Sequence, residues 1–195
     1  MAGMAETCRI LLVSGSLRDG STNTALLRTA RAVAPPGIEA VLYDRLGSLP
    51  HFNPDDDPDG GPVHPAVADL RAQIAAADAL LFCTPEYAGA LPGSFKNLLD
   101  WTVGGGETYG MPVGWVNVSG RASPAGAAGA HASLRTVLTY TGTDIVDAAC
   151  VRVPVAHGAV GPDGEIADPA VRDAAAQALA TLAEHAGRQR LDAST

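Results

Sequence analysis

Short apolar runs alternate along the chain with segments whose apolar residues recur at helical spacing. The first run begins at Ile10, and the others occupy residues 39–43, 79–84, 113–118 and 145–153. Continuous apolar runs of this length are typical of strands that are buried on both faces of a parallel sheet. Apolar residues three and four positions apart predict helices over residues 22–33, 63–77, 95–101, 134–138 and 168–188, with a frayed tail from residue 191.

The alternation predicts an α/β fold, with one five-stranded parallel sheet and helices on both faces. Such sheets bind ligands beyond the carboxyl ends of their strands, at the point where the strand order reverses. The loops after the first, third and fourth strands have unusual compositions, and we expect them to converge there. The length of 195 residues fits a single domain, residues 1–195.

The composition argues against several classes of protein. The formal net charge of −8 disfavours nucleic acid as a partner, because its phosphates select positive surfaces. No apolar run is long enough to span a membrane, and the best candidate, residues 74–83, is interrupted by Asp78. The N-terminus lacks the basic and apolar regions of a signal peptide, and the three cysteines are an odd number in strand-like contexts. We therefore expect a cytoplasmic protein with reduced cysteines.

The most informative stretch runs from Ile10 to Asn23 and reads I-L-L-V-S-G-S-L-R-D-G-S-T-N. A buried strand ends in small and hydroxyl-bearing residues with one arginine, Arg18, and a helix follows. Backbone N–H groups, hydroxyls and a guanidinium at the positive end of a helix dipole form a phosphate site. The loop matches neither a Walker A motif nor G-x-G-x-x-G, because Gly15 and Gly20 are too far apart and no lysine follows Gly20. An ordinary strand-to-helix turn is the alternative.

Three further segments have compositions that suggest a role. Residues 84–93 contain two prolines, two glycines and Tyr87, which predicts a rigid platform for a flat ligand at the end of the third strand. The loop after the fourth strand begins with Ser119, Gly120 and Arg121. Residues 104–106 are three glycines, which predicts a hinge or lid, and the long connection over residues 44–61 is expected to be irregular.

Two motifs stand out at this separation: Gly15-Ser16-Leu17-Arg18-x-x-Ser21-x-Asn23, and Pro85-Glu86-Tyr87-x-Gly89-x-x-Pro92-Gly93-x-x-Lys96-Asn97-x-x-Asp100-Trp101. Together they resemble the NAD(P)H-dependent FMN reductase family, which is flavodoxin-like and includes quinone, chromate and azo-dye reductases. The resemblance covers about Cys8 to Val153 and implies a three-layer flavodoxin-like sandwich. It also implies an FMN site, whose residues here are Ser16, Arg18, Ser21, Thr22 and Asn23 for the phosphate, Pro85, Glu86, Tyr87, Ala88 and Gly89 for the isoalloxazine, and Ser119 and Gly120 for further contacts. Ala88 departs from the family, in which this position is often asparagine.

No side chain is expected to act as a catalyst, because a flavin carries out hydride transfer and the protein positions it. No G-x-S-x-G motif occurs, and the five histidines lack metal-ligand spacing, so no metal site is expected. We expect Glu86 to offer backbone groups to the flavin edge, with a general base as the alternative. Tyr87 either walls the pocket or packs, His131 either lines the pocket or is an ordinary surface histidine, and Arg121 either meets a nicotinamide phosphate or is solvated.

The sequence therefore predicts an enzyme that binds FMN without a covalent bond and takes electrons from NADPH or NADH. The acceptor is a small molecule: a free flavin, a quinone or an electrophilic xenobiotic. The alternatives are a flavodoxin-type electron carrier and a non-enzymatic flavin-binding module. Phe95, Leu99 and Trp101 give the helix after the platform more apolar surface than one helix face needs, and Phe95 and Trp101 are either core or interface residues. Since the family implies a subunit contact in this region, we expect a homodimer or a tetramer.

Overall fold

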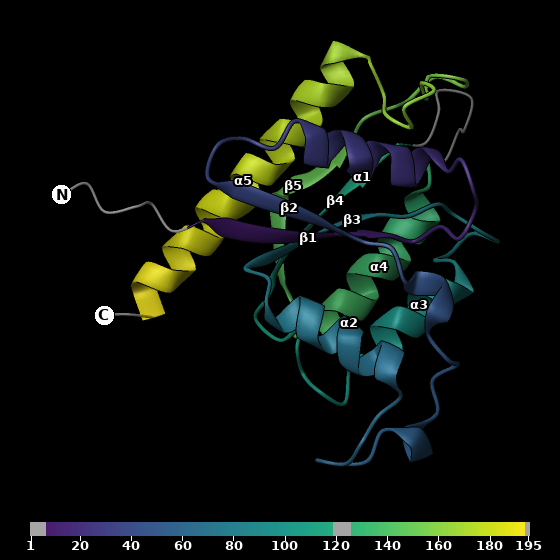
Figure 1. Ribbon diagram of the computed structural model, residues 1–195, viewed down its shortest axis with the longest axis vertical. Helices are drawn as coiled ribbons and strands as arrows, with labels where there is room; N and C mark the ends of the chain where they lie inside the picture. Colours follow the sequence, from purple (N-terminus) through teal and green to yellow (C-terminus); the bar gives the residue numbers. More distant parts are fainter. Residues whose placement is uncertain (1–6, 119–125, 194–195) are drawn as a thin grey trace.

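A parallel sheet of five strands crosses the centre of the molecule in the order β2-β1-β3-β4-β5 (Figure 1). The computed structural model describes residues 7–118 and 126–193. All neighbouring strands are parallel, as the alternation of runs predicted. The strands are β1 (Cys8–Ser14), β2 (Ile38–Tyr43), β3 (Ala79–Cys83), β4 (Pro112–Asn117) and β5 (Asp144–Arg152).

Helices cover both faces of this sheet, which confirms the three-layer α/β arrangement (Figure 1). The helices on one face are α1 (Thr22–Ala32) and α5 (Pro169–Ala193). Those on the other face are α2 (Pro65–Ala75), α3 (Gly93–Asp100) and α4 (Ala128–Tyr140).

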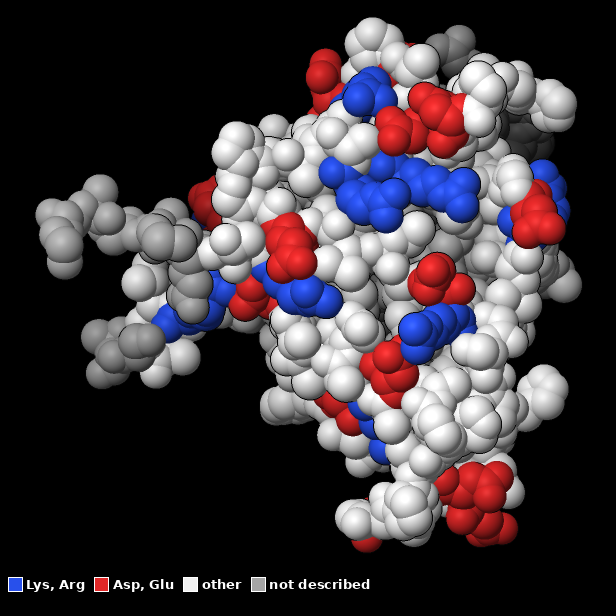
Figure 2. Space-filling model, in the orientation of Figure 1, with Lys and Arg blue, Asp and Glu red and all other residues white. Residues whose placement is uncertain are grey.

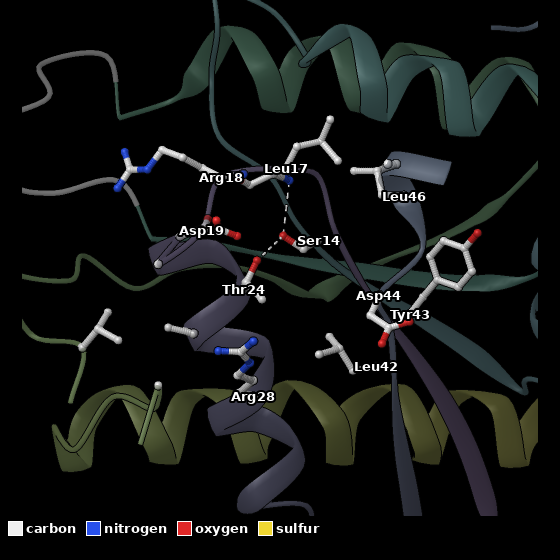
Figure 3. Close-up of a pocket in the computed structure, with 17 residues that line it drawn as sticks. Ser14, Leu17, Arg18, Asp19, Thr24, Arg28, Leu42, Tyr43, Asp44 and Leu46 are labelled. Carbon is white, nitrogen blue, oxygen red and sulfur yellow. Dashed lines mark hydrogen bonds between the residues drawn. The ribbon is translucent and has the colours of Figure 1, made fainter. Parts of the chain in front are cut away.

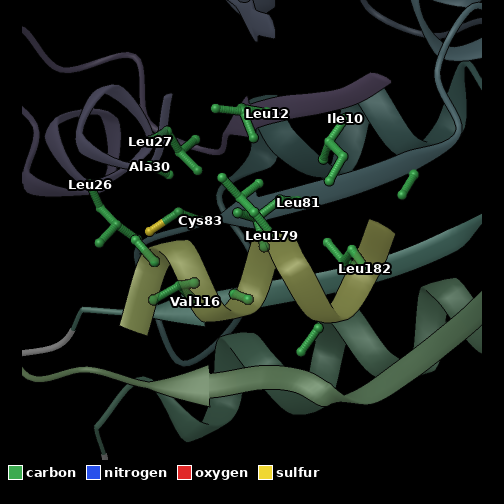
Figure 4. Close-up of a cluster of buried hydrophobic side chains, with 14 of the residues drawn as sticks. Ile10, Leu12, Leu26, Leu27, Ala30, Leu81, Cys83, Val116, Leu179 and Leu182 are labelled. Atoms are coloured by element: carbon green, nitrogen blue, oxygen red, sulfur yellow. The ribbon is translucent and has the colours of Figure 1, made fainter. Parts of the chain in front are cut away.

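The side chains of β1 show how one apolar run supplies two cores. Successive side chains of a strand point to opposite faces. Ile10 and Leu12 therefore pack with α1 and α5, where Leu179 lies against them (Figure 4). Leu11 and Val13 pack on the other face with α2, α3 and α4. Because both faces are buried, the strand reads as a continuous apolar run rather than as an alternating one.

The strand order reverses between β1 and β3. The chain passes from β1 to β2 on one side and then crosses to β3 on the other side of β1. The loops after β1 and β3 therefore leave the carboxyl edge of the sheet next to each other. Sheets of this kind bind ligands at such a position.

Helix α5 is longer than the sequence predicted. It continues past Gly187, where we expected it to end in a frayed tail. Beyond that glycine, Gln189 donates a hydrogen bond to Asp144 Oδ2 over 2.6 Å, and Arg190 pairs with Asp78. These two anchors to the sheet offset the cost of a glycine inside a helix, which is about 1 kcal/mol.

The connection over residues 44–61 is irregular, as predicted, apart from short 3₁₀ helices at Leu46–Ser48 and Pro54–Asp56. Its residue Asp57 pairs with Arg71 of α2 at 2.7 Å. A Cβ atom on Gly104 would overlap the Asp57 carboxylate, so the three-glycine segment lies against this ion pair. Movement of that segment as a lid stays a prediction.

The apolar residues of α3 do not form a surface for a subunit contact, and this part of the sequence interpretation is wrong. Phe95 and Trp101 are 0% exposed and Leu99 is 1% exposed within the chain itself. Phe95 packs edge to face on Phe82, with ring centroids 5.3 Å apart. The Trp101 indole N–H donates to the carbonyl of Pro50 over 2.8 Å. These side chains belong to the core because α3 lies directly on the sheet.

The three cysteines lie in β1, β3 and β5 and are unpaired, as predicted. Burial raises the pKa of Cys150 to about 11, so its thiol stays protonated near neutral pH. Over residues 7–118 and 126–193, no helix is both long enough and apolar enough to cross a membrane.

Candidate functional site

The loop between β1 and α1 presents an unused helix N-terminus. Ser21 is the N-cap of α1, but its side chain makes no capping hydrogen bond, and the first turn holds no acidic residue. The first N–H groups of a helix have no partner inside the helix and carry the positive end of its dipole. This end of α1 therefore suits an anion, as the sequence predicted.

Hydrogen bonds between neighbouring side chains hold this loop in shape. Ser14 Oγ lies 2.8 Å from Thr24 Oγ1 and accepts from the backbone N–H of Ser16 over 3.3 Å. Ser16 Oγ in turn accepts from the backbone N–H of Arg18 over 3.2 Å. Gly20 has a φ of +66°, a conformation that favours glycine. Hydrogen bonds among its own residues thus fix the shape of the loop.

Three of the five residues expected at the phosphate line one cleft of about 350 Å³ beside this loop, namely Ser16, Arg18 and Ser21 (Figure 3). Arg18 is exposed and forms no ion pair with the residues that the structure describes. Thr22 and Asn23 lie in the first turn of α1 but do not line the cleft. The Asn23 side chain points to β3 instead, where its Oδ1 accepts from Cys83 Sγ over 3.3 Å.

The loop after β1 and the loop after β3 are in direct contact. The backbone N–H of Gly15 donates to the carbonyl of Cys83 over 2.9 Å. A Cβ atom on Gly15 would overlap Thr84 Oγ1, so the close approach requires glycine here. Two of the three loops that we expected to meet at the sheet edge therefore do so.

The predicted platform after β3 is a tight turn. Tyr87 and Ala90 exchange two backbone hydrogen bonds of 3.1 Å, and the residues between them, Ala88 and Gly89, have φ values of +51° and +75°. Two central residues with positive φ identify a type I′ turn. Tyr87 is 52% exposed, so its ring is not packed into the core and remains available as a wall for a ligand.

The side chain of Glu86 joins this platform to α4. Its Oε2 accepts from the backbone N–H of Ala130 over 3.1 Å. A Cβ atom on Gly129 would overlap the carbonyl oxygen of Gly89, so the start of α4 and the turn are in contact. The carboxylate thus caps the positive end of a helix, which favours a positioning role over a general base.

His131 lies beside Glu86, at the start of α4, and is partly buried. Its ring packs on Trp115 with centroids 5.9 Å apart. Burial lowers its pKa, and the negative charge of Glu86 opposes this shift. Its Nε2 is buried and has no hydrogen-bond partner among the described residues. His131 is therefore neither a solvated surface histidine nor one satisfied by its neighbours.

Ser119, Gly120 and Arg121, expected in the third loop, lie outside the described residues. A hydrogen bond joins the chain before this segment to the chain after it: the Asn117 side-chain amide donates to the carbonyl of Gly126. Within the described residues, no group of three His, Cys, Asp or Glu side chains could hold a metal ion.

The sequence interpretation missed several residues that line the cleft with Arg18. They include Thr24 and Arg28 of α1 and Asp44, which follows β2. The parallel pairing of β1 with β2 brings Asp44 to the same edge as the loop. A polar residue directly after the second predicted strand was the one signal in the sequence that could have identified it.

These observations fit FMN. Its phosphate carries negative charge, and the loop offers an uncapped helix N-terminus, the Ser21 hydroxyl and an unpaired arginine, Arg18. The turn from Pro85 to Gly89 would bear the isoalloxazine ring, next to the loop through the contact of Gly15 with Thr84.

Comparisons with known proteins identify the family. Residues 8–158 match the family described as NADPH-dependent FMN reductase. The chain is 36% identical over 181 residues to an NAD(P)H-dependent FMN reductase of Pseudomonas aeruginosa, which covers 92% of this chain and 95% of the relative. It is 31% identical over 160 residues to a quinone reductase of Pseudomonas putida, covering 79% of each. Among solved structures, FerB, a flavoenzyme NAD(P)H:acceptor oxidoreductase from Paracoccus denitrificans, matches with a TM-score of 0.74 at 27% identity, over 92% of this chain and 99% of that chain.

The fold and the site define a flavodoxin-like flavoprotein, in which the loop after β1 meets the turn after β3 at the reversal of the strand order. The chain belongs to the NADPH-dependent FMN reductase family, whose match spans residues 8–158. FMN is its cofactor and NAD(P)H its electron donor, and it is a flavin-containing oxidoreductase, as the two motifs predicted. This membership favours the enzyme over the electron carrier and the non-enzymatic module.

Proposed function

We propose that this chain transfers electrons from NADPH or NADH through bound FMN to a small acceptor, namely a quinone, a free flavin or an electrophilic xenobiotic. FMN, when bound, supplies the hydride chemistry. One observation carries the proposal: the uncapped N-terminus of α1 and the unpaired Arg18 lie in the loop that contacts the platform after β3. The quinone reductases among the relatives support a quinone as acceptor.

The protein residues are proposed to bind and orient the cofactor. Arg18 and the start of α1 hold the phosphate by charge, since a charged donor strengthens a hydrogen bond to a phosphate about twofold. The backbone of the turn from Glu86 to Gly89 supports the ring edge, and the exposed ring of Tyr87 forms a wall. No side chain is assigned a proton transfer.

The test is a spectroscopic titration without oxygen. The FMN-loaded protein should lose the absorbance of oxidised flavin when NADPH or NADH is added, and a quinone or free flavin should restore it. Steady-state rates should follow ping-pong kinetics, because the donor and the acceptor use the flavin in turn. Reduction no faster than that of free FMN with the same nicotinamide would refute the proposed function.

We further propose a homodimer or a tetramer in the cytoplasm. Several large apolar side chains are exposed, among them Tyr109 at 79% and Tyr140 at 85%. Tyr109 lies against Gly142, just after the helix that ends with Tyr140. A second subunit would bury this surface. Light scattering at micromolar concentration should give at least the mass of two chains, and a monomer with FMN bound would contradict the proposal.

A further inference from the structure

The cleft beside the phosphate loop extends away from the platform, toward β2. Its walls are α1, the end of β2, the 3₁₀ helix Leu46–Ser48 and the segment that includes Val160 and Gly164 (Figure 3). Its volume of about 350 Å³ is within the range of small-molecule sites. The FMN phosphate and ring account for the loop and the platform but not for this space.

The cleft shares Ser16, Arg18 and Ser21 with the predicted phosphate site. A group that is joined through a phosphate at this loop therefore has a direct path into the cleft. This continuity points to the second half of a dinucleotide rather than to an unrelated small molecule.

Unpaired charges lie on both sides of the cleft. Arg28 of α1 is exposed and reaches over Gly164, where a Cβ atom would lie 2.8 Å from its Nη1. Asp44, directly after β2, is also exposed. Neither side chain has an ion pair or a hydrogen bond among the residues that the structure describes. Figure 3 shows them on either side of Leu42, and Figure 2 shows arginines as a blue band across α1.

These groups suit the parts of a nucleoside phosphate. A guanidinium pairs with a phosphate, and a carboxylate accepts hydrogen bonds from the hydroxyls of a ribose. Dinucleotide-binding sheets use one of two related arrangements: an acidic residue binds the ribose 2′-hydroxyl, or an arginine binds a 2′-phosphate in its place. The remaining wall is apolar and suits a flat base: Ala25, Leu42, Leu46 and Val160.

We propose that the cleft binds the adenylate half of a dinucleotide, with Asp44 on the ribose hydroxyls and Arg28 on a phosphate. Two kinds of dinucleotide carry an adenylate: the nicotinamide electron donor, NADPH or NADH, and FAD, whose other half is the FMN group. The proposal rests on the proposed function only in its choice of these two kinds of molecule.

Calorimetry tests the cleft without turnover. In the first arm, ADP, which keeps both ribose hydroxyls, is titrated into FMN-loaded protein. In the second arm, FAD and FMN are titrated into the protein free of flavin. The variants are Arg28→Ala and Asp44→Asn. Their matched controls are Arg31→Ala, one turn further along α1 and outside the cleft, and Asp59→Asn, an exposed carboxylate in the long connection.

We expect Arg28→Ala to weaken adenylate binding about tenfold or more, because losing one hydrogen bond to a charged group commonly lowers an affinity by about that factor. Asp44→Asn should weaken it severalfold, and neither variant should change the affinity for FMN. Loss of ADP binding in the variants identifies the nicotinamide dinucleotide as the source. Loss of an FAD-over-FMN preference identifies FAD. If both arms give the same affinities for the variants and their controls, or if neither ligand binds, the proposal is wrong. Absence of flavin reduction by both NADPH and NADH in the wild type would instead refute the proposed function and leave these binding results intact.

Discussion

The carboxylate of Glu86 accepts a hydrogen bond from the backbone N–H of Ala130 over 3.1 Å. This contact fixes the platform turn after β3 to the first turn of α4, although the two residues are 44 positions apart in the chain. The platform therefore depends on a helix that belongs to the next unit of the fold.

Replacing Glu86 should loosen this connection. We expect Glu86→Ala to lower the free energy of unfolding by about 1–2 kcal/mol, the usual cost of losing a helix cap. Glu86→Gln keeps an acceptor oxygen and should cost less. Urea titration measures both. Because we assign the carboxylate to positioning, Glu86→Gln should retain flavin reduction by NADPH; loss of that reaction at normal stability would show a chemical role.

The turn itself contains a strained residue. Ala88 has a φ of +51°, a left-handed conformation that costs an alanine about 1–2 kcal/mol. Ala88→Gly should therefore raise the free energy of unfolding by about 1 kcal/mol, and Ala88→Asn by less. Ala90→Gly is the control, because Ala90 does not have a positive φ and glycine there should destabilise. Equal effects at both positions in thermal unfolding would refute the assignment.

The layered fold followed from the sequence because the three central strands, β1, β3 and β4, are buried on both faces and read as apolar runs. The loop after β1 could be recognised because its hydroxyls, its arginine and the start of the following helix are neighbours in the sequence. The role of Glu86 could not be predicted, since its partner is a backbone N–H far along the chain. The sequence left Trp101 open between core and interface for a similar reason: its indole N–H donates to the carbonyl of Pro50, in a loop whose path no periodicity describes.

The cleft shows the same limit. Arg28 and Asp44 belong to different elements, and only the pairing of β1 with β2 brings them to one edge. Either residue alone is an ordinary surface charge in the sequence. The end of α5 was predicted too early because Gly187 is a local signal, while the anchors beyond it are contacts with distant residues, Asp144 and Asp78.

A buried hydroxyl ties α1 to the wall of the cleft. Thr29 Oγ1 donates to the carbonyl of Ala25 and accepts from the backbone N–H of Ile166, both over 2.8 Å. Thr29→Val should leave that N–H buried without an acceptor and cost about 1–3 kcal/mol in urea titration. Thr136→Val is matched, because exposed Thr136 makes the same bond to its own helix but accepts from no distant group. A cost no larger than that of the control would show that the Ile166 contact contributes nothing.

His131 should make stability depend on pH. Its pKa is lowered by burial, so the unfolded chain binds its proton more readily than the folded one. Above the pKa of the unfolded chain, about 6.5, protonation of this histidine does not lower the free energy of unfolding. As the pH falls through that pKa toward the lower pKa of the folded chain, the unfolded chain takes up the proton first and stability is lost. Between pH 7 and 5.5, the free energy of unfolding should fall more for the wild type than for His131→Gln. Parallel curves would contradict this, and His157→Gln, at an exposed position, is the control.

Arg18 should distinguish the phosphate from the rest of the cofactor. It is exposed in the loop and has no ion pair among the described residues, so its removal should leave the fold intact. Arg18→Ala should weaken FMN binding about ten- to a hundredfold, because a hydrogen bond to a charged group is worth roughly 1.5–3 kcal/mol. Riboflavin has no phosphate and should lose little. Fluorescence titration of both flavins decides this, with Arg31→Ala as the control for lost positive charge. Equal losses for FMN and riboflavin, or no loss for FMN, would show that the hydroxyls and the start of α1 hold the phosphate without Arg18.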